Sequence, residues 1–233
     1  MLTLNVTLKS AQLRFDLFLP QTDSPAPLVI VAHGWLRDRT RMSGWGRRLA
    51  EEGFVVAVPD LPTFSDHPRN ARAINELIAW LRTDRSTSSR IDPSRIGAVG
   101  FSSGGLSTLL AAADNPQIRI WVGIDPVELR GLGVAAAPRF HAKAVVVRAP
   151  PSSWNHDGNA LHLEQALPGG ATDFVVPDAV HIDPEWPTDW QMEILMGKTD
   201  EARREQFVRH AVDALRAELM PAQRDVENAS RGK

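Results

Sequence analysis

The chain has 233 residues, of which 43% are hydrophobic and 23% are charged, and its formal net charge is −2 at pH 7. These values are typical of a globular domain with a sizeable core and give no support for a nucleic-acid or anionic-membrane partner. Because the sequence contains no cysteine, disulfides, thiolate metal sites and a cysteine nucleophile are excluded.

The N-terminal residues predict two antiparallel strands. Apolar and polar residues alternate in Leu2–Leu8 and again in Leu13–Leu19, which is the pattern of strands with one buried face. The same stretch lacks the continuous apolar core of a signal peptide, and no stretch of the sequence approaches the length of a transmembrane helix. We therefore expect a cytoplasmic protein that does not insert into membranes.

The rest of the chain alternates continuous apolar runs with helical patterns. The runs, which predict strands covered on both faces, are Leu28–Ala32, Phe54–Val58, Ile96–Val99, Ile118–Ile124 and Ala144–Val147. Thr172–Val176 is predicted to be the last strand. Apolar residues at helical spacing occur in Ile74–Leu81, Leu106–Ala113 and Val208–Leu219. Strands that alternate with helices predict an α/β fold with a doubly wound, mostly parallel sheet that follows the antiparallel N-terminal strands.

The domain organisation is expected to be simple. We predict one domain over residues 1–220 and a polar C-terminal tail over residues 221–233. The segment from Asp125 to Ala144 is short, so we expect no large cap domain and an open cleft.

The run Gly100-Phe101-Ser102-Ser103-Gly104 directly follows a predicted strand and precedes a predicted helix. In a tight turn of this kind, the residues two before and two after an exposed serine must be nearly free of side chains. Gly100 and Gly104 meet this demand for Ser102, whereas Phe101 fails it for Ser103. Ser102 is therefore the predicted nucleophile.

A serine nucleophile needs a base, and the base comes last in chain order when the serine lies at such a turn. His181 follows the last predicted strand and precedes the final helix, which is the expected place for that base. His156, in a polar loop, is the alternative. His33 is interpreted as a structural residue that holds its loop by hydrogen bonds.

The acid that orients the base is predicted to be Asp125, at the carboxyl end of the Ile118–Ile124 strand. Neighbouring strands end about 5 Å apart, so a carboxylate at this edge can reach the same imidazole. Asp157 is the alternative, because it is the first carboxylate after the next strand, Ala144–Val147.

Two backbone N–H groups are expected to stabilise the oxyanion, those of Ser103 and of Trp35, which lies in the loop after Leu28–Ala32. Aromatic side chains on candidate loops are expected to line the substrate site, with plain packing as the alternative, namely Trp35, Phe64, Trp154, Trp186 and Trp190. Metal-binding motifs such as H-E-x-x-H, P-loops and dinucleotide fingerprints do not occur, so we expect neither a metal nor a cofactor.

Together these residues resemble the α/β-hydrolase superfamily from about Leu13 to Leu219, and within it the branch of chlorophyllases, dienelactone-hydrolase-like proteins and cutinase-like polyester hydrolases. The chlorophyllase-like group shares Asp125-Pro126-Val127, Asn155-His156 and His181-Ile182-Asp183, and this resemblance also implies that Asp125 is the acid. Chlorophyllases carry G-H-S-R-G-G where this chain has Gly-Phe-Ser-Ser-Gly-Gly, which favours a general ester hydrolase.

The expected function is that of a cofactor-free serine carboxylesterase, which cleaves a small-molecule or polymeric ester through a covalent acyl-enzyme. Lactone hydrolysis of the dienelactone type, or perhydrolysis, by the same three residues is the first alternative. Hydrolysis of a chlorophyll-type ester is another. The alternative from a different class is a catalytically inactive binding protein with the same fold. We assign no oligomeric state.

Overall fold

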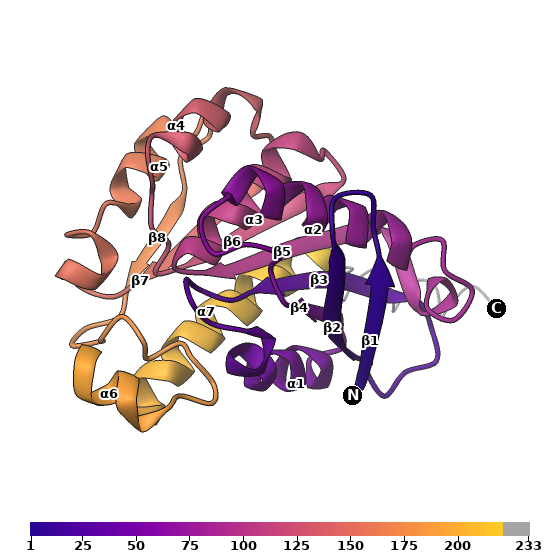
Figure 1. Cartoon of the computed structure of the whole chain (residues 1–233), viewed down its shortest axis with the longest axis horizontal. Helices are drawn as coiled ribbons and strands as arrows, with labels where there is room; N and C mark the ends of the chain where they lie inside the picture. The colour runs from indigo at the N-terminus through magenta and orange to yellow at the C-terminus, as the bar shows by residue number, and fades with distance from the viewer. Residues whose placement is uncertain (221–233) are drawn as a thin grey trace, which may run out of the picture.

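A computed structural model describes residues 1–220, and its centre is an eight-stranded sheet in the order β1-β2-β4-β3-β5-β6-β7-β8 (Figure 1). The first two strands, β1 (Leu2–Thr7) and β2 (Gln12–Phe18), are antiparallel to each other, and β2 is antiparallel to β4 (Val55–Pro59). The other neighbours are parallel and comprise β3 (Ala26–Ala32), β5 (Ile91–Phe101), β6 (Ile118–Ile124), β7 (Lys143–Arg148) and β8 (Thr172–Val175). The predicted mostly parallel α/β sheet is confirmed.

Helices cover both faces of the sheet (Figure 1). On one face lie α2 (His67–Leu81) and α3 (Ser103–Asp114), whose apolar residues share a buried cluster with the sheet. On the other face lie α1 (Ser43–Glu51) and α7 (Glu201–Leu219), which share a second cluster. Burial of these two faces excludes water from both sides of the sheet and drives its formation.

The sequence pattern did not predict helix α1, because two glycines interrupt the row of apolar residues on its buried face. A Cβ on Gly44 would lie 2.2 Å from the Trp186 ring, and one on Gly46 would lie 2.4 Å from the Phe18 ring. The glycines therefore allow aromatic side chains to pack directly on the helix backbone, where an apolar side chain would otherwise stand.

Three short helices complete the fold, α4 (Leu132–Ala136), α5 (Ala160–Ala166) and α6 (Trp190–Met196). The segment between β6 and β7 holds α4 and one 3-10 turn rather than a large cap, as expected. The single domain over residues 1–220 stays a prediction, and the predicted tail over residues 221–233 lies outside the described residues. Of the helices within residues 1–220, none is long and apolar enough to cross a membrane.

Candidate active site

Ser102 lies in the sharp turn between β5 and α3. Its backbone adopts a φ of 53° and a ψ of −125°, which is a strained conformation for a residue with a side chain. The turn is held because the Ser102 N–H donates to the Ile124 carbonyl at 3.0 Å, and the Ser102 carbonyl accepts from the Val127 N–H at 3.2 Å. The hydroxyl is thereby presented at the carboxyl edge of the sheet, where ligands bind in open α/β folds.

The two glycines of the turn lack the space for a side chain. A Cβ on Gly104 would lie 2.2 Å from the His33 carbonyl oxygen, and one on Gly100 would lie 2.3 Å from the Thr108 hydroxyl. Real Cβ atoms do not approach so closely, so both positions require glycine. The requirement for glycine that the sequence predicted is correct, but at Gly104 the atoms that leave no room for a side chain belong to the end of β3 and to His33 after it.

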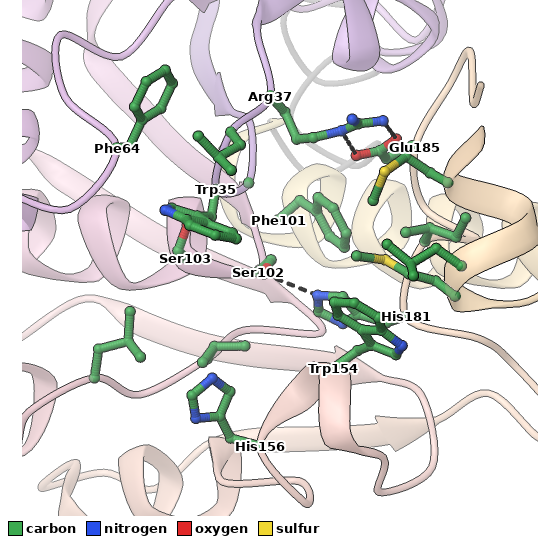
Figure 2. Close-up of a pocket in the computed structure, with 18 of the residues that line it drawn as sticks. Trp35, Arg37, Phe64, Phe101, Ser102, Ser103, Trp154, His156, His181 and Glu185 are labelled. Atoms are coloured by element: carbon green, nitrogen blue, oxygen red, sulfur yellow. Dashed lines mark hydrogen bonds and ion pairs between the residues drawn. The ribbon is translucent and has the colours of Figure 1, made fainter. Parts of the chain in front are cut away.

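Ser102, His181 and Asp125 form a continuous chain of hydrogen bonds. The Ser102 Oγ lies 2.9 Å from the His181 Nε2 (Figure 2), and the His181 Nδ1 lies 2.6 Å from the Asp125 Oδ2. The three side chains are all buried, with exposed fractions of 8%, 5% and 1% in this order. Because a carboxylate accepts from Nδ1–H, the neutral imidazole leaves Nε2 free to accept the serine proton.

The alternative residues from the sequence do not join this chain. His156 and Asp157 are both exposed, and neither forms a side-chain hydrogen bond with Ser102, Asp125 or His181. His156 does line the cavity above Ser102. The structure therefore brings together the favoured acid and base and leaves the two alternatives apart from them.

Asp125 is oriented by the segment that follows the neighbouring strand. Its N–H donates to the Val147 carbonyl of β7 at 2.7 Å, and its Oδ1 accepts from the Ala149 N–H at 3.1 Å and from the Asn155 Nδ2 at 3.2 Å. Sequence reasoning assigned no role to Asn155. The Asn155-His156 pair, which contributed to the family resemblance, was the signal that could have found it.

His181 is held by its own loop. The Asp183 carboxylate, which is fully buried, accepts from the Val180 N–H at 2.7 Å and from the Arg203 Nε at 2.7 Å, so it ties the loop to α7. On its other side, the imidazole packs against Phe101 with 5.1 Å between ring centroids. These contacts fix the ring between the serine and the aspartate.

The loop after β3 approaches Ser102 closely. A Cβ on Gly34 would lie 3.2 Å from the Ser102 Cβ, and the next residue, Trp35, lines the same cavity as Ser102 and Ser103. His33 holds this loop, because its Nδ1 donates to the Gly34 carbonyl and its Nε2 accepts from the Leu61 N–H, both at 2.9 Å. Burial lowers the pKa of His33, which keeps the ring neutral and suits this pair of bonds.

A cavity of about 630 Å³ opens above Ser102. Three of the expected aromatic residues line it, Trp35, Phe64 and Trp154 (Figure 2). Trp186, which was also expected there, is not among the lining residues. It packs on Gly44 and beneath the Arg204 guanidinium, which lies 5.9 Å from its ring centroid. Its backbone explains the difference. The Trp186 N–H donates to the Arg41 carbonyl, and this bond turns the segment toward α1.

Helix α6 forms a wall of this cavity that the sequence did not reveal. Met192, Leu195 and Met196 line the cavity at helical spacing, whereas Trp190 is 67% exposed and is not among the lining residues. A further lining pair is Arg37 and Glu185, whose atoms Nε and Oε1 are 2.6 Å apart (Figure 2). Among residues 1–220, no group of three or more His, Asp or Glu side chains is arranged to hold a metal ion.

The order of the strands, and a serine at the β5–α3 turn bonded to a histidine from a later loop, define an α/β hydrolase. More narrowly, the chain belongs to the PET hydrolase-like family, whose model matches residues 17–138.

Known proteins extend this assignment. The chain is 30% identical over 116 residues to the cutinase est1 of Thermobifida alba, an alignment that covers 48% of this chain and 39% of that protein. It is 32% identical over 109 residues to a bis(hydroxyethyl) terephthalate hydrolase of Streptomyces coelicolor, covering 46% of this chain and 35% of that protein. The chain thus matches less than half the length of these relatives.

The fold also matches a solved structure, that of a dienelactone hydrolase from Anabaena variabilis. The TM-score is 0.75 at 18% sequence identity, and the match covers 94% of this chain and 97% of the other. This likeness concerns the fold, and it confirms the α/β-hydrolase architecture expected from the sequence.

Proposed function

We propose that this protein is a serine hydrolase that cleaves carboxylic esters through a covalent acyl-enzyme. The observation that carries the proposal is the buried chain from the Ser102 hydroxyl through His181 to Asp125, with links of 2.9 and 2.6 Å. These distances are those of a nucleophile bonded to its base and of a base bonded to its orienting acid. Membership of the PET hydrolase-like family supports the same class of reaction.

In the proposed acylation, the Ser102 Oγ attacks the ester carbonyl carbon while the His181 Nε2 takes the hydroxyl proton. Asp125 holds the imidazole in the Nδ1–H tautomer and stabilises the imidazolium that forms. The carbonyl oxygen becomes an oxyanion, which the N–H groups of Ser103 and Trp35 would stabilise.

The tetrahedral intermediate then collapses, and the imidazolium gives its proton to the leaving alcohol. A water molecule next attacks the acyl-enzyme while His181 takes one of its protons, and the same donors again hold the oxyanion. Release of the acid regenerates the Ser102 hydroxyl, so no cofactor is consumed in the cycle.

The walls of the cavity favour an apolar, bulky ester. Trp35 and Phe64 are 59% and 56% exposed at its mouth, and Trp154 adds a third aromatic surface. Within residues 1–220 no large cap covers this mouth, so a substrate chain longer than the cavity can extend out of it. The names of the relatives, a cutinase and a bis(hydroxyethyl) terephthalate hydrolase, point to ester substrates of this kind.

The test is labelling with a fluorophosphonate probe, followed by hydrolysis of nitrophenyl esters of graded acyl length. We expect the wild type to be labelled and to hydrolyse the esters, and Ser102→Ala to lose both properties. Ser103→Ala keeps the backbone N–H and the neighbouring hydroxyl, so it is the matched control and should still be labelled. A wild type that neither reacts with the probe nor hydrolyses any ester or lactone of the panel would point to a binding protein.

A further inference from the structure

A second buried histidine lines the cavity. His67, the first residue of α2, is 3% exposed and is among the residues that border the cavity, as are Phe64 and Ser103. Figure 2 shows Phe64 and Ser103 on the other side of Ser102 from His181. The mechanism proposed above uses no group of His67.

One edge of the His67 ring is fixed by α3. Its Nδ1 lies 3.0 Å from the Ser107 Oγ, and Ser107 is fully buried. The Ser107 hydroxyl in turn donates to the Ser103 carbonyl at 3.3 Å, one helical turn back. We assign the serine proton to that bond, because the Asn70 Nδ2 also donates to the Ser107 Oγ, at 3.5 Å. This assignment makes the Ser107 Oγ an acceptor toward His67 and places the ring proton on Nδ1.

The other edge of the ring is then an acceptor. In the Nδ1–H tautomer the Nε2 lone pair is free, and within residues 1–220 this atom forms no hydrogen bond with another side chain or backbone group. Burial lowers the pKa of His67, with Arg130 adding to the effect and Asp66 opposing it, so the ring is neutral at pH 7. A neutral acceptor in an apolar wall interacts favourably with a hydrogen-bond donor and poorly with a hydrocarbon.

From this geometry we propose that His67 is a specificity residue, whose Nε2 accepts a hydrogen bond from a hydroxyl group on the acyl or the alcohol part of the ester. The proposal rests on the proposed ester hydrolysis and names the feature that the substrate carries. Arg37 and Glu185, which also line the cavity, are already bonded to each other in an ion pair, whereas the Nε2 of His67 keeps a free lone pair for this contact.

The test compares isosteric esters with and without a hydroxyl. On the acyl side the pair is the nitrophenyl esters of 3-hydroxybutyrate and 3-methylbutyrate, and on the alcohol side it is 2-hydroxyethyl and propyl benzoate. The measured quantity is the ratio of kcat/KM within each pair, because a loss common to both members cancels in the ratio.

Two variants distinguish the contribution of the His67 Nδ1 from that of its Nε2. Asparagine can replace the Nδ1 contact with Ser107 but cannot reach the Nε2 position, so His67→Asn should lower the ratio about threefold to tenfold in one of the pairs, the worth of one neutral hydrogen bond. Glutamine reaches the Nε2 position, so His67→Gln should retain most of the ratio. An unchanged ratio in His67→Asn for both pairs, or an equal fall in the two variants, overturns the proposal.

A measurement on the wild type stands apart from the variants. Nitrogen-15 NMR should show His67 as the Nδ1–H tautomer, and an Nε2–H tautomer overturns the proposal.

If the wild type hydrolyses no ester, the proposed function has failed, and the same ester pairs are then used as ligands. The hydroxylated member should then shift the His67 Nε2 resonance and its isostere should not, and equal shifts would overturn the inference.

Discussion

The Asn155 side-chain amide donates to both carboxylate oxygens of Asp125, at 3.2 Å to Oδ1 and 3.3 Å to Oδ2. Asn155 is itself 1% exposed, and its amide oxygen accepts from the Ser152 N–H. The loop after β7 thus places a fixed donor against the acid that orients His181. A buried carboxylate that loses such a donor is held less firmly and is less well stabilised as an anion.

We expect Asn155→Ala to lower kcat for a nitrophenyl ester by about tenfold to a hundredfold, the worth of one hydrogen bond to a charged group. KM should change much less, because Asn155 is not among the residues that line the cavity. Asn159→Ala is the matched control, since the Asn159 amide bonds the backbone of Glu128 rather than Asp125. Equal kcat values for the two variants would show that Asn155 does not contribute to catalysis through Asp125.

The assignment of the acid is tested by two Asp→Asn substitutions. Asp125→Asn keeps the shape of the side chain but favours the wrong imidazole tautomer, so kcat should fall by about 10⁴-fold. Asp157→Asn changes an exposed side chain and should leave kcat within about twofold of the wild-type value. Steady-state hydrolysis of a short nitrophenyl ester measures both, and the reverse ranking would make Asp157 the acid.

The tight turn at Ser102 predicts a large difference between two Gly→Ala substitutions. At Gly104 the new Cβ would lie 2.2 Å from a backbone oxygen, so Gly104→Ala should lower the free energy of unfolding by at least about 1–3 kcal/mol. A Cβ on Gly169 would meet no heavy atom within 4 Å, so Gly169→Ala should be close to neutral. Chemical denaturation gives both free energies of unfolding. Similar values for the two variants would mean that the loop after β3 shifts at little cost to accommodate the new Cβ.

Trp154 and Trp186 should respond in opposite ways to truncation. Trp154→Ala removes part of the cavity wall, so kcat/KM for aromatic esters should fall while the melting temperature changes little. Trp186→Ala leaves a void beside α1 and should lower the melting temperature, with a cost that approaches the roughly 3–5 kcal/mol of a large core truncation. Calorimetry and ester kinetics on both variants distinguish the two roles. A Trp186→Ala variant that changes only KM, with no change in melting temperature, would show that Trp186 contacts the substrate.

Glu164 predicts a pH-dependent loss of stability. Burial, aided by the charge of Asp173, raises its pKa to about 7, although Arg148 opposes the shift. The folded state therefore holds a proton that the unfolded state releases near pH 4.5, and this stabilisation is lost as the pH rises from about 4.5 through about 7. Glu164→Gln removes this pH-dependent change in stability, because glutamine does not titrate.

The melting temperatures of Glu164→Gln and of the wild type should therefore differ little below pH 4.5 and diverge as the pH rises. At pH 8 the variant should be the more stable, by about 2–4 °C for each kcal/mol recovered. A difference that is constant from about pH 4 to pH 8 would show that Glu164 titrates normally.

The buried part of the sheet was predictable because a buried parallel strand needs a continuous apolar run, and each run from Leu28–Ala32 to Ala144–Val147 became a strand. Thr172–Val176 also became a strand, β8, which is mostly exposed at the edge of the sheet. Ser102 was predictable for a local reason, since the glycines that permit its turn stand beside it in the sequence. Asp125 and His181 followed from chain order and from the edge at which parallel strands end.

What the sequence did not reveal depends on contacts between distant segments. Trp186 packs on Gly44 because of backbone hydrogen bonds to residues in the turn before α1 and in α1 itself, and no local pattern records that pairing. The same holds for Arg37 with Glu185, and for the Asn155 amide at Asp125, where position in the fold and not residue spacing sets the partner.

Arg37 follows Trp35 closely in the chain, and its guanidinium binds the carboxylates of Glu185 and Asp189, in the segment that follows His181. Glu185 is 1% exposed, so separating it from Arg37 would strand a carboxylate in the interior at a cost of about 3–5 kcal/mol. This ion-pair network therefore joins the segment that carries the expected oxyanion donor to the segment that follows the expected base. We therefore expect a movement of one of these segments to be coupled to a movement of the other.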